Sequence, residues 1–411
     1  MSTDPANITE IEDKVAQQLK SQRVGFLLGA GSSYLNNYGY PLAFQLWDKI
    51  KDRITDLAKR QDTDKYLFSV IQMLDQVART TGRHLGDDTL SAELLTRISQ
   101  ALVAHKTNAM RLHGFRTQAM FAHVVSALSA CRAITEEDSG VMFTIDADCR
   151  RPDFRIVTLG GEQLLVEVKN CHHADLHKPY RIKSDYLTSL RKYAHCMEAP
   201  LKIAIFWSRW KLWTLVDIND LPSAERSSGI CLADAMLLNE MYILGDSLLA
   251  TVPPLTFRIY ADQSKPCNVE PDGSVPFTIS EVAFLAGDVQ IVNKLEKDLA
   301  WFFILHSKWI EMAMPADILN GKLQYADFRY GPGERQQETT DQPFEMLGFL
   351  SSMISSQYID ATSINSDVVS LTPTGDPEQF GMAIPDDYQG QVLKLWRFTI
   401  HPRKKRTAES G

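Results

Sequence analysis

The stretch PDFRIVTLGGEQLLVEVK, residues 152–169, decides the expected fold of this chain. Residues 154–158 are rich in strand-forming side chains, and residues 163–169 form a second apolar run of the same character. Between these runs, residues 159–162 contain two glycines and a polar side chain, which is typical of a tight turn. The pattern therefore predicts a β-hairpin folded about Gly160.

Three charged side chains come together on this predicted hairpin. Folding about Gly160 places Asp153 opposite Glu167, so that their side chains are neighbours across the two strands. Lys169 follows Glu167 by two residues, and the alternation of side chains along a strand puts both on one face. Carboxylate oxygens are ligands that Mg²⁺ prefers, and an ammonium group beside them can serve an attacking water. The hairpin therefore predicts a metal-dependent hydrolytic site, against the alternative of an inert hairpin with surface charge.

The motif Pro152-Asp153 with Glu167-Val168-Lys169 resembles that of the PD-(D/E)XK nuclease superfamily. The resemblance implies that Asp153 and Glu167 bind Mg²⁺ or Mn²⁺, and that Val168 adds its backbone carbonyl as a ligand. It also implies that Lys169 positions or activates the attacking water. The implied activity is endonucleolytic hydrolysis of phosphodiester bonds in DNA, or in RNA, and the implied role is that of a bacterial antiviral-defence or restriction effector.

Elements around the hairpin complete the expected core. Apolar periodicity predicts a helix over residues 113–134 and an amphipathic helix over residues 184–197. Strands are predicted at three further apolar runs, residues 141–145, 201–207 and 212–216. The order αβββαβ is the one expected of a restriction-endonuclease-like core, which the sequence places in residues 107–220.

Further residues near the hairpin are candidate metal ligands. Glu137 and Asp138, at the expected end of the first helix, could add a carboxylate, although a solvated acidic helix end explains them equally well. The run Cys171-His172-His173, followed by His177, has zinc-binding residue types. These residues crowd into one loop without a second ligand pair, so a loop histidine or a phosphate contact is favoured over zinc.

The segment after the predicted site is basic, although the net charge of the whole chain is −8 and argues against a broad nucleic-acid-binding surface. Arg181, Lys183, Arg191 and Lys192 are predicted to bind phosphates of a nucleic acid. The same segment contains three tryptophans, Trp207, Trp210 and Trp213. Each of them either stacks on a base or packs in the core, and for any one of them the core is the better interpretation.

A Gly-rich turn near the N-terminus supports a second hypothesis. The apolar run that ends in Gly29-Ala30-Gly31, with Gly39-Tyr40-Pro41 after it, resembles the opening of sirtuin-like domains. The alternative function is therefore NAD binding or NAD hydrolysis. The sequence shows no later Thr-x-Asn-x-Asp element of that family, and residues 1–106 otherwise favour a mainly helical module.

Length and composition set the remaining expectations on domains and partners. At 411 residues, with 23% charged and 44% hydrophobic residues, the chain is typical of a globular protein with more than one domain. Residues 221–411 are predicted to form a mixed α/β domain for recognition or partner binding. That layout suggests a further alternative, a non-catalytic assembly subunit such as the partner of a short prokaryotic Argonaute. A protein partner or a homo-oligomer is therefore expected beside the nucleic acid substrate.

The sequence also indicates where the protein resides. No apolar run approaches the length of about 20 residues that spans a membrane, so no membrane association is expected. Residues 1–5 lack the basic and apolar layout of a signal peptide. The six cysteines are scattered and show no paired spacing. Together these features favour reduced thiols and a cytoplasmic protein.

Overall fold

The computed structural model describes most of the chain beyond residue 73. The described ranges are 74–100, 109–137, 148–333, 343–371 and 384–403, with gaps at 85, 91, 95, 98–99, 365–366, 369 and 386. Residues 74–81 are helical, and so is much of 89–100. The Gly29–Gly31 turn and the rest of the expected helical module lie outside the described residues.

The chain divides into two compact units that interleave along the sequence. The hairpin unit holds the described residues of Asp52–Ser247, Phe349–Ala383 and Thr399–Gly411. The second unit holds those of Leu248–Gly348 and Ile384–Phe398. This interleaving differs from the three consecutive domains expected from the sequence, whose boundaries stay a prediction.

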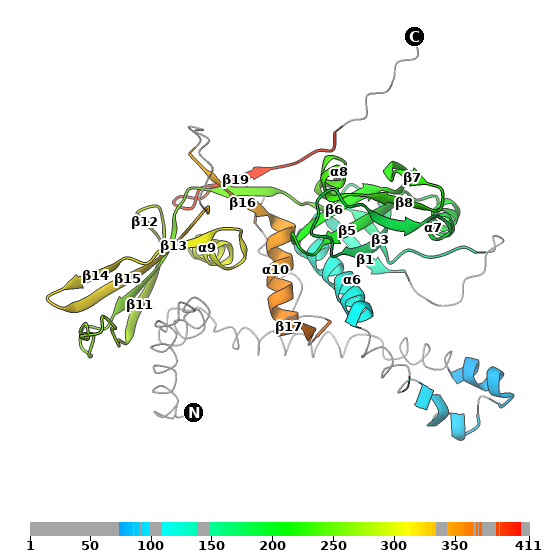
Figure 1. Cartoon of the computed structure of the whole chain (residues 1–411), viewed down its shortest axis with the longest axis horizontal. Helices are drawn as coiled ribbons and strands as arrows, with labels where there is room; N and C mark the ends of the chain where they lie inside the picture. Colours follow the sequence, from blue (N-terminus) through cyan, green and yellow to red (C-terminus); the bar gives the residue numbers. More distant parts are fainter. Residues whose placement is uncertain are drawn as a thin grey trace, which may run out of the picture. The chain divides into compact units, whose positions relative to one another are not determined.

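The hairpin unit is built on a five-stranded sheet in the order β1-β2-β3-β5-β6 (Figure 1). Its main elements are α6 (Ala109–Ala127), β1 (Cys131–Glu136), β2 (Phe154–Thr158), β3 (Gln163–Cys171), β4 (Tyr180–Lys183), α7 (Ser184–Cys196), β5 (Leu201–Trp207) and β6 (Leu212–Asp217). Within this sheet β3 and β5 run parallel, and the other neighbours are antiparallel. The short β4 pairs instead with β8 in a separate small sheet.

The predicted hairpin is confirmed. β2 and β3 pair antiparallel, with Phe154 opposite Val166. Continuing this register by one residue puts Asp153 opposite Glu167, which is the pairing that a turn about Gly160 requires. Two carboxylates are therefore brought together by the geometry of a single local turn.

The helix expected over residues 113–134 ends earlier, at Ala127. Ser129 adopts a left-handed backbone with φ of +58°, which ends the helix, and β1 follows at Cys131–Glu136. The prediction is wrong beyond Ala127 because residues 131–136 pair with β2, and this cross-strand pairing outweighs the apolar periodicity. The strand expected at 141–145 lies outside the described residues.

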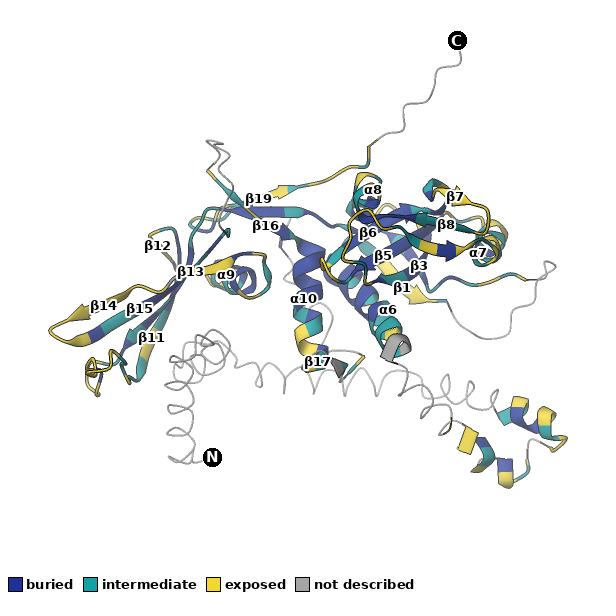
Figure 2. Cartoon of the chain, viewed as in Figure 1, coloured by how far each residue is buried: buried dark blue, intermediate teal, exposed yellow. Residues whose placement is uncertain are grey.

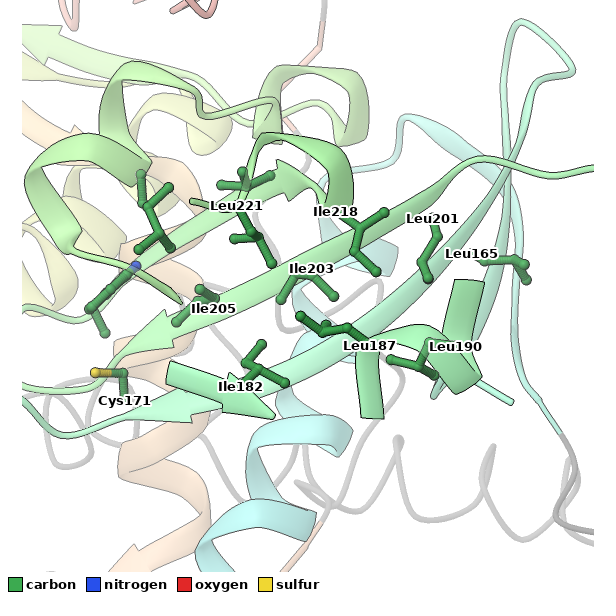
Figure 3. Packing of buried hydrophobic residues seen from close by; sticks show 14 of the residues in the cluster. Leu165, Cys171, Ile182, Leu187, Leu190, Leu201, Ile203, Ile205, Ile218 and Leu221 are labelled. Atoms are coloured by element: carbon green, nitrogen blue, oxygen red, sulfur yellow. The ribbon is translucent and has the colours of Figure 1, made fainter. Parts of the chain in front are cut away.

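Apolar layers cover both faces of the sheet. The central strand β5 reads LKIAIFW, and each of its residues is buried (Figure 2). On one face, Leu187 and Leu190 of α7 belong to the same buried cluster as Leu165 of β3 and Ile203 of β5 (Figure 3). Burying one such aliphatic side chain contributes about 1.5–3 kcal/mol, so this layer holds β3 and α7 in a fixed relation.

The other face of the sheet is covered by α6 and by α10 (Leu350–Thr362), which pack against each other (Figure 1). Phe121 of α6 contacts Phe154 and Trp213, with ring centroids 5.6 and 5.3 Å apart. Trp213 in turn donates its indole N–H to Ser355 Oγ of α10 at 2.9 Å. The helix α10, which is distant from the sheet strands in the sequence, thereby completes the layer on this face of the sheet.

The smaller elements of the hairpin unit follow β6 or α10 along the chain. They are η1 (Ile218–Asp220), β7 (Ser223–Ala224), β8 (Ser227–Ile230), α8 (Leu232–Leu237), η2 (Met241–Leu244), β17 (Ser363–Ile364) and β18 (Asp367–Val368). The carboxylate of Asp246, just after η2, accepts hydrogen bonds from the amide and hydroxyl of Ser351 at 2.9 and 2.6 Å. Asp246 therefore satisfies the first turn of α10 from a distant segment.

The second unit contains a larger antiparallel sheet in the order β12-β11-β10-β15-β13, with β14 also paired to β15. Its elements are β9 (Leu248–Thr251), β10 (Leu255–Ala261), β11 (Ile279–Ala286), β12 (Val289–Ile291), α9 (Lys294–His306), β13 (Ile310–Ala313), β14 (Ala316–Leu319), β15 (Lys322–Gly331), β16 (Glu345–Phe349) and β19 (Leu395–Phe398). Trp301 of α9 packs on Phe257 and Phe284 of the sheet. The predicted mixed α/β class is confirmed, and no described helix is long and apolar enough to cross a membrane.

Candidate active site

Asp153 lies where β2 and β3 separate. β2 begins at Phe154, which pairs with Val166, so within the described structure the part of β3 after Val166 has no partner strand on this side. The edge of β3 at Val168 is therefore open to a side chain. Asp153 occupies this edge: its Oδ2 accepts a hydrogen bond from the Val168 amide at 2.7 Å, and its Oδ1 accepts one from Gln118 Nε2 at 2.6 Å. The carboxylate is therefore fixed from two sides, by the strand and by α6.

Glu167 and Lys169 lie beside Asp153 on β3. Glu167 is 1% exposed, and its Oε1 forms an ion pair with Lys169 Nζ and accepts a hydrogen bond from the Tyr186 hydroxyl of α7. Lys169 Nζ also lies 3.3 Å from Tyr186 Oη. The expected position of Glu167 and Lys169 on one face of the strand is confirmed by this contact.

Tyr186 is in contact with two cations. Lys169 Nζ lies 4.8 Å from the centre of its ring, and the guanidinium carbon of Arg150 lies 4.7 Å from the same centre. Both distances are within the range of cation–π attraction. Arg150 is exposed, so it adds an accessible positive charge next to the buried carboxylate of Glu167.

Burial and charge set the protonation of the site. Burial raises the pKa of Asp153 to about 7, and the negative charges of Glu167 and Glu136 act in the same direction, against the Val168 amide and Lys169. Burial is the largest single influence on Lys169 and lowers its pKa, but the charge and hydrogen bond of Glu167, together with Tyr186 and Asp153, outweigh burial and hold that pKa above its usual value. Lys169 is therefore a cation at neutral pH, whereas Asp153 is close to half-protonated.

The available donors fit a divalent cation that prefers oxygen ligands. Burial and the repulsion from Glu167 both raise the pKa of Asp153, which means that the ionised carboxylate is unfavourable here. A bound cation would stabilise the ionised form. The amide and carbonyl of one strand residue point to the same side, so Val168 directs its carbonyl toward Asp153 as well. Among the described residues, no group of three His, Cys, Asp or Glu side chains could hold a metal ion. A cation here would therefore need the Val168 carbonyl and water beside the two carboxylates.

The Glu137 carboxylate makes contacts apart from the carboxylates of Asp153 and Glu167, and its role as a further metal ligand stays a prediction. Its Oε1 accepts a hydrogen bond from Arg155 Nε at 2.6 Å, and its Oε2 accepts one from the Tyr193 hydroxyl. Glu137 follows β1 rather than ending a helix, which brings it beside Arg155 of β2. Asp138 lies outside the described residues.

The four basic residues predicted to bind nucleic acid differ in their surroundings. Arg181 and Lys183 are exposed on β4. Arg191 is half-buried and donates through Nη2 to the Ile218 carbonyl at 3.1 Å, which ties α7 to η1. Lys192 is half-buried on α7. Phosphate binding by these residues stays a prediction, and Arg181 and Lys183 are the two most accessible to a ligand.

Some of the other candidate residues are buried in the core, and others are exposed to solvent. Cys171 is 1% exposed and packs in the apolar cluster beneath α7, so its thiol is not available to a metal beside the exposed His172. Trp207 and Trp213 are 1% and 2% exposed and belong to the core, whereas Trp210 is 39% exposed. Of these three tryptophans, Trp210 alone is accessible for stacking on a base.

Four residues near the site escape detection from the sequence. Gln118 and Glu136 precede the motif, and neither occupies a position that its pattern specifies. Arg150 lies just before the motif but shows no spacing that marks it. The helical pattern predicts Tyr186 on the apolar side of its helix, but it does not reveal that the Tyr186 hydroxyl donates a hydrogen bond to Glu167.

A comparison with solved structures finds Hjc, a Holliday junction resolvase from the archaeal hyperthermophile Archaeoglobus fulgidus. The similarity covers 30% of this chain and 93% of Hjc, with 20% sequence identity and a TM-score of 0.24. No family model and no curated protein sequence matches this chain. The geometry of the site itself therefore carries the functional conclusion.

Proposed function

We propose that this chain is a metal-dependent nuclease with a restriction-endonuclease-like core that hydrolyses phosphodiester bonds of DNA or RNA. The observation that carries the proposal is the placement of Asp153, Glu167 and Lys169 at the open edge of β3. One buried and one half-buried carboxylate, a backbone carbonyl and one cation there supply the groups that metal-assisted phosphodiester hydrolysis requires.

Each residue of the site has a role in this proposal. Asp153, Glu167 and the Val168 carbonyl would hold Mg²⁺ or Mn²⁺. When bound, such an ion stabilises negative charge on the phosphate and increases the acidity of bound water. Lys169 is kept protonated by Glu167, so it orients the attacking water as a hydrogen-bond donor and does not remove its proton. Tyr186 positions both Glu167 and Lys169 through its hydroxyl.

The direct test is cleavage of plasmid DNA, linear DNA, single-stranded DNA and RNA in Mg²⁺, Mn²⁺ or EDTA. Wild type and Lys169→Ala are compared at matched purity, with Lys265→Ala as a control that removes an exposed lysine of the second unit. The proposal expects metal-dependent cleavage of at least one substrate, lost in Lys169→Ala and retained in Lys265→Ala. Cleavage that survives in Lys169→Ala would assign the activity to another site or to a contaminant.

Metal binding gives a second readout that does not depend on cleavage. A ligand at 100 times its Kd stabilises a protein by about 2.7 kcal/mol. Mg²⁺ should therefore raise the thermal midpoint of wild type, and Asp153→Ala should lose this increase. A chain that neither cleaves nor gains stability from Mg²⁺ would be the non-catalytic assembly subunit of the alternative hypothesis.

The biological setting extends this proposal. A defence or restriction effector is the role that the resemblance implies. The domain layout adds a protein partner or a homo-oligomer, and the scattered cysteines favour the cytoplasm. The NAD hypothesis depends on the Gly29-Ala30-Gly31 turn, which lies outside the described residues. Titration of the protein with NAD tests it separately, because NAD binding would persist in Lys169→Ala.

A further inference from the structure

The turn that joins β5 to β6 presents a tryptophan and an arginine to solvent. Residues 208–211 form this turn, and both Arg209 and Trp210 are exposed. Trp210 differs in this respect from Trp207 and Trp213 at the adjoining strand ends, which are buried. An exposed indole can stack on a base, and a neighbouring guanidinium can pair with a phosphate of the same strand.

The turn is anchored at both of its ends. The Ser208 amide and hydroxyl donate to the Cys171 carbonyl at 2.9 and 3.1 Å, and Ser208 Oγ lies 2.7 Å from His172 Nδ1. At the other end, Lys211 Nζ donates to Ser356 Oγ of α10 at 3.3 Å. Arg209 and Trp210 are therefore held in place next to the end of β3, without the entropy cost of ordering a flexible loop.

Positive charge gathers around His172. The imidazoles of His172 and His113 lie with their ring centroids 6.2 Å apart. Partial burial lowers the pKa of His172, and His113, Arg209 and Arg116 lower it further in that order. These neighbours are all of cationic type, so the fold brings like charges together here, and an anion would relieve their repulsion.

A carboxylate is near one of the surrounding lysines. Asp360 is within electrostatic reach of Lys211, so that lysine is partly compensated and does not belong to the anion site. Arg116 is also committed in part, because its Nη1 donates to Ser363 Oγ at 2.6 Å, although its buried Nε has no hydrogen-bond partner in the described structure. Arg209 is therefore the cation accessible to a ligand at this point, and His172, whose pKa is lowered, stands beside it as a neutral imidazole that can donate a hydrogen bond.

The cluster follows the candidate active site along the same strand. His172 comes three residues after Lys169, which corresponds to roughly 10 Å of strand. Stacked nucleotides advance by about 3.4 Å along one strand, so this distance equals about three nucleotides. The odd separation and the contact of His172 with His113 of α6 put this cluster on the other face of the sheet from Lys169. A nucleic acid strand that reaches both sites therefore passes the end of β3, a path of a few nucleotides.

We propose that Arg209, His172 and Trp210 form a subsite for an unpaired segment of the nucleic acid substrate, adjoining the cleavage site. Arg209 and His172 contact a backbone phosphate, and Trp210 stacks on an unpaired base. This inference rests on the proposed nuclease function and adds to it a preference for substrates with a single-stranded segment near the cleaved bond.

The test is equilibrium binding of a fluorescently labelled single-stranded DNA, measured by anisotropy in EDTA so that no metal-dependent cleavage occurs. Wild type is compared with Trp210→Ala and Arg209→Ala at several salt concentrations. The control is Arg132→Ala, which removes an exposed arginine of β1 at the end of the sheet away from Asp153. Thermal unfolding of each variant establishes that it is folded, which is expected because all three side chains are exposed.

Trp210→Ala should weaken single-strand binding roughly tenfold, since stacking on one base is lost, and should leave the salt dependence unchanged. Arg209→Ala should also weaken binding, and should reduce the slope of log K against log salt by about 0.7, the value for one phosphate contact on a single strand. Arg132→Ala should bind like wild type, and competition by unlabelled duplex DNA should be weaker than by single strand.

Each other outcome overturns the subsite. Equal binding by wild type, Trp210→Ala and Arg209→Ala would show that these residues do not touch the strand. A loss in Arg132→Ala as large as in Arg209→Ala would indicate general charge attraction instead of a site. No measurable single-strand binding by wild type would also refute it. Failure of the nuclease proposal is distinguishable, because it would appear as binding that depends on Arg209 and Trp210 without any metal-dependent cleavage.

Discussion

Replacing Asp153 by asparagine should stabilise the metal-free protein above neutral pH. Burial, and secondarily the charge of Glu167, raise the pKa of this carboxyl from 3.8 to about 7. Asparagine offers an oxygen to the Val168 amide, and its NH2 group can donate to Gln118 once the Gln118 amide turns over to present its oxygen in place of Nε2. Asp153→Asn therefore removes the charge while keeping both hydrogen bonds, and it isolates the cost of burying a carboxylate.

The sign follows from proton binding in the two states. The carboxyl ionises near pH 3.8 in the unfolded chain and near pH 7 in the folded chain, so the folded state binds more protons between these values. The contribution of this carboxyl to the stability of the folded state is most favourable below pH 3.8 and falls as the pH rises to about 7. The separation of the two pKa values corresponds to about 4 kcal/mol, which the partial exposure of Asp153 reduces to about 2–4 kcal/mol. The gain in Asp153→Asn should reach this size at pH 8 and be smaller at pH 5.

Urea unfolding in EDTA at pH 5 and pH 8 measures this gain. Tryptophan fluorescence follows unfolding, with Trp207 and Trp213 contributing from the hairpin unit and Trp301, Trp309 and Trp396 from the second unit. Asp288→Asn, in the exposed turn between β11 and β12, is the matched control. Addition of Mg²⁺ should then stabilise wild type and leave Asp153→Asn unchanged. A variant no more stable than wild type at pH 8, or a gain of equal size at both pH values, would refute the reasoning that burial penalises this carboxylate.

Three further substitutions give separate tests. Gln118→Ala should weaken Mg²⁺ binding roughly tenfold in calorimetric titrations, because it releases one oxygen of Asp153; unchanged affinity would show that the Val168 amide suffices. Tyr186→Phe should lower the initial rate of cleavage roughly tenfold with the thermal midpoint changed little, since it removes one hydrogen bond to Glu167, and an unaltered rate would deny Tyr186 a positioning role. Ile203→Ala should destabilise the hairpin unit by about 2–5 kcal/mol in urea unfolding, and a loss below 1 kcal/mol would indicate that the layer under α7 repacks.

The sequence predicts the hairpin well because its information is local. Turn chemistry at Gly160 and alternation along two short strands determine the register, and the register alone brings Asp153 to Glu167. Strand β5 is equally clear, because a continuous apolar run of this length is typical of a strand buried on both faces. These features need no knowledge of distant parts of the chain.

The remaining features depend on contacts between distant segments. Gln118 and Tyr186 meet the site only after α6 and α7 have packed on opposite faces of the sheet. The sequence does not predict the end of α6, because the segment after Ala127 is apolar enough to continue a helix and its pairing with β2 cannot be read locally. The ion pair of Glu137 with Arg155 is likewise hidden from the sequence, since Arg155 lies on the neighbouring strand.

The return of α10 to the hairpin unit has a consequence for isolating this unit as a fragment. A fragment ended near residue 220 would lack Ser355, leaving the Trp213 indole without its partner and one face of α6 uncovered. The amide of Leu350, however, donates to the Ser247 carbonyl at 2.9 Å, so the chain leaves and re-enters this unit at almost the same point. Leu248–Gly348 is therefore an insertion in the hairpin unit, and Ile384–Phe398, whose strand β19 pairs with β9, is a second one, so both segments have to be removed together to isolate this unit.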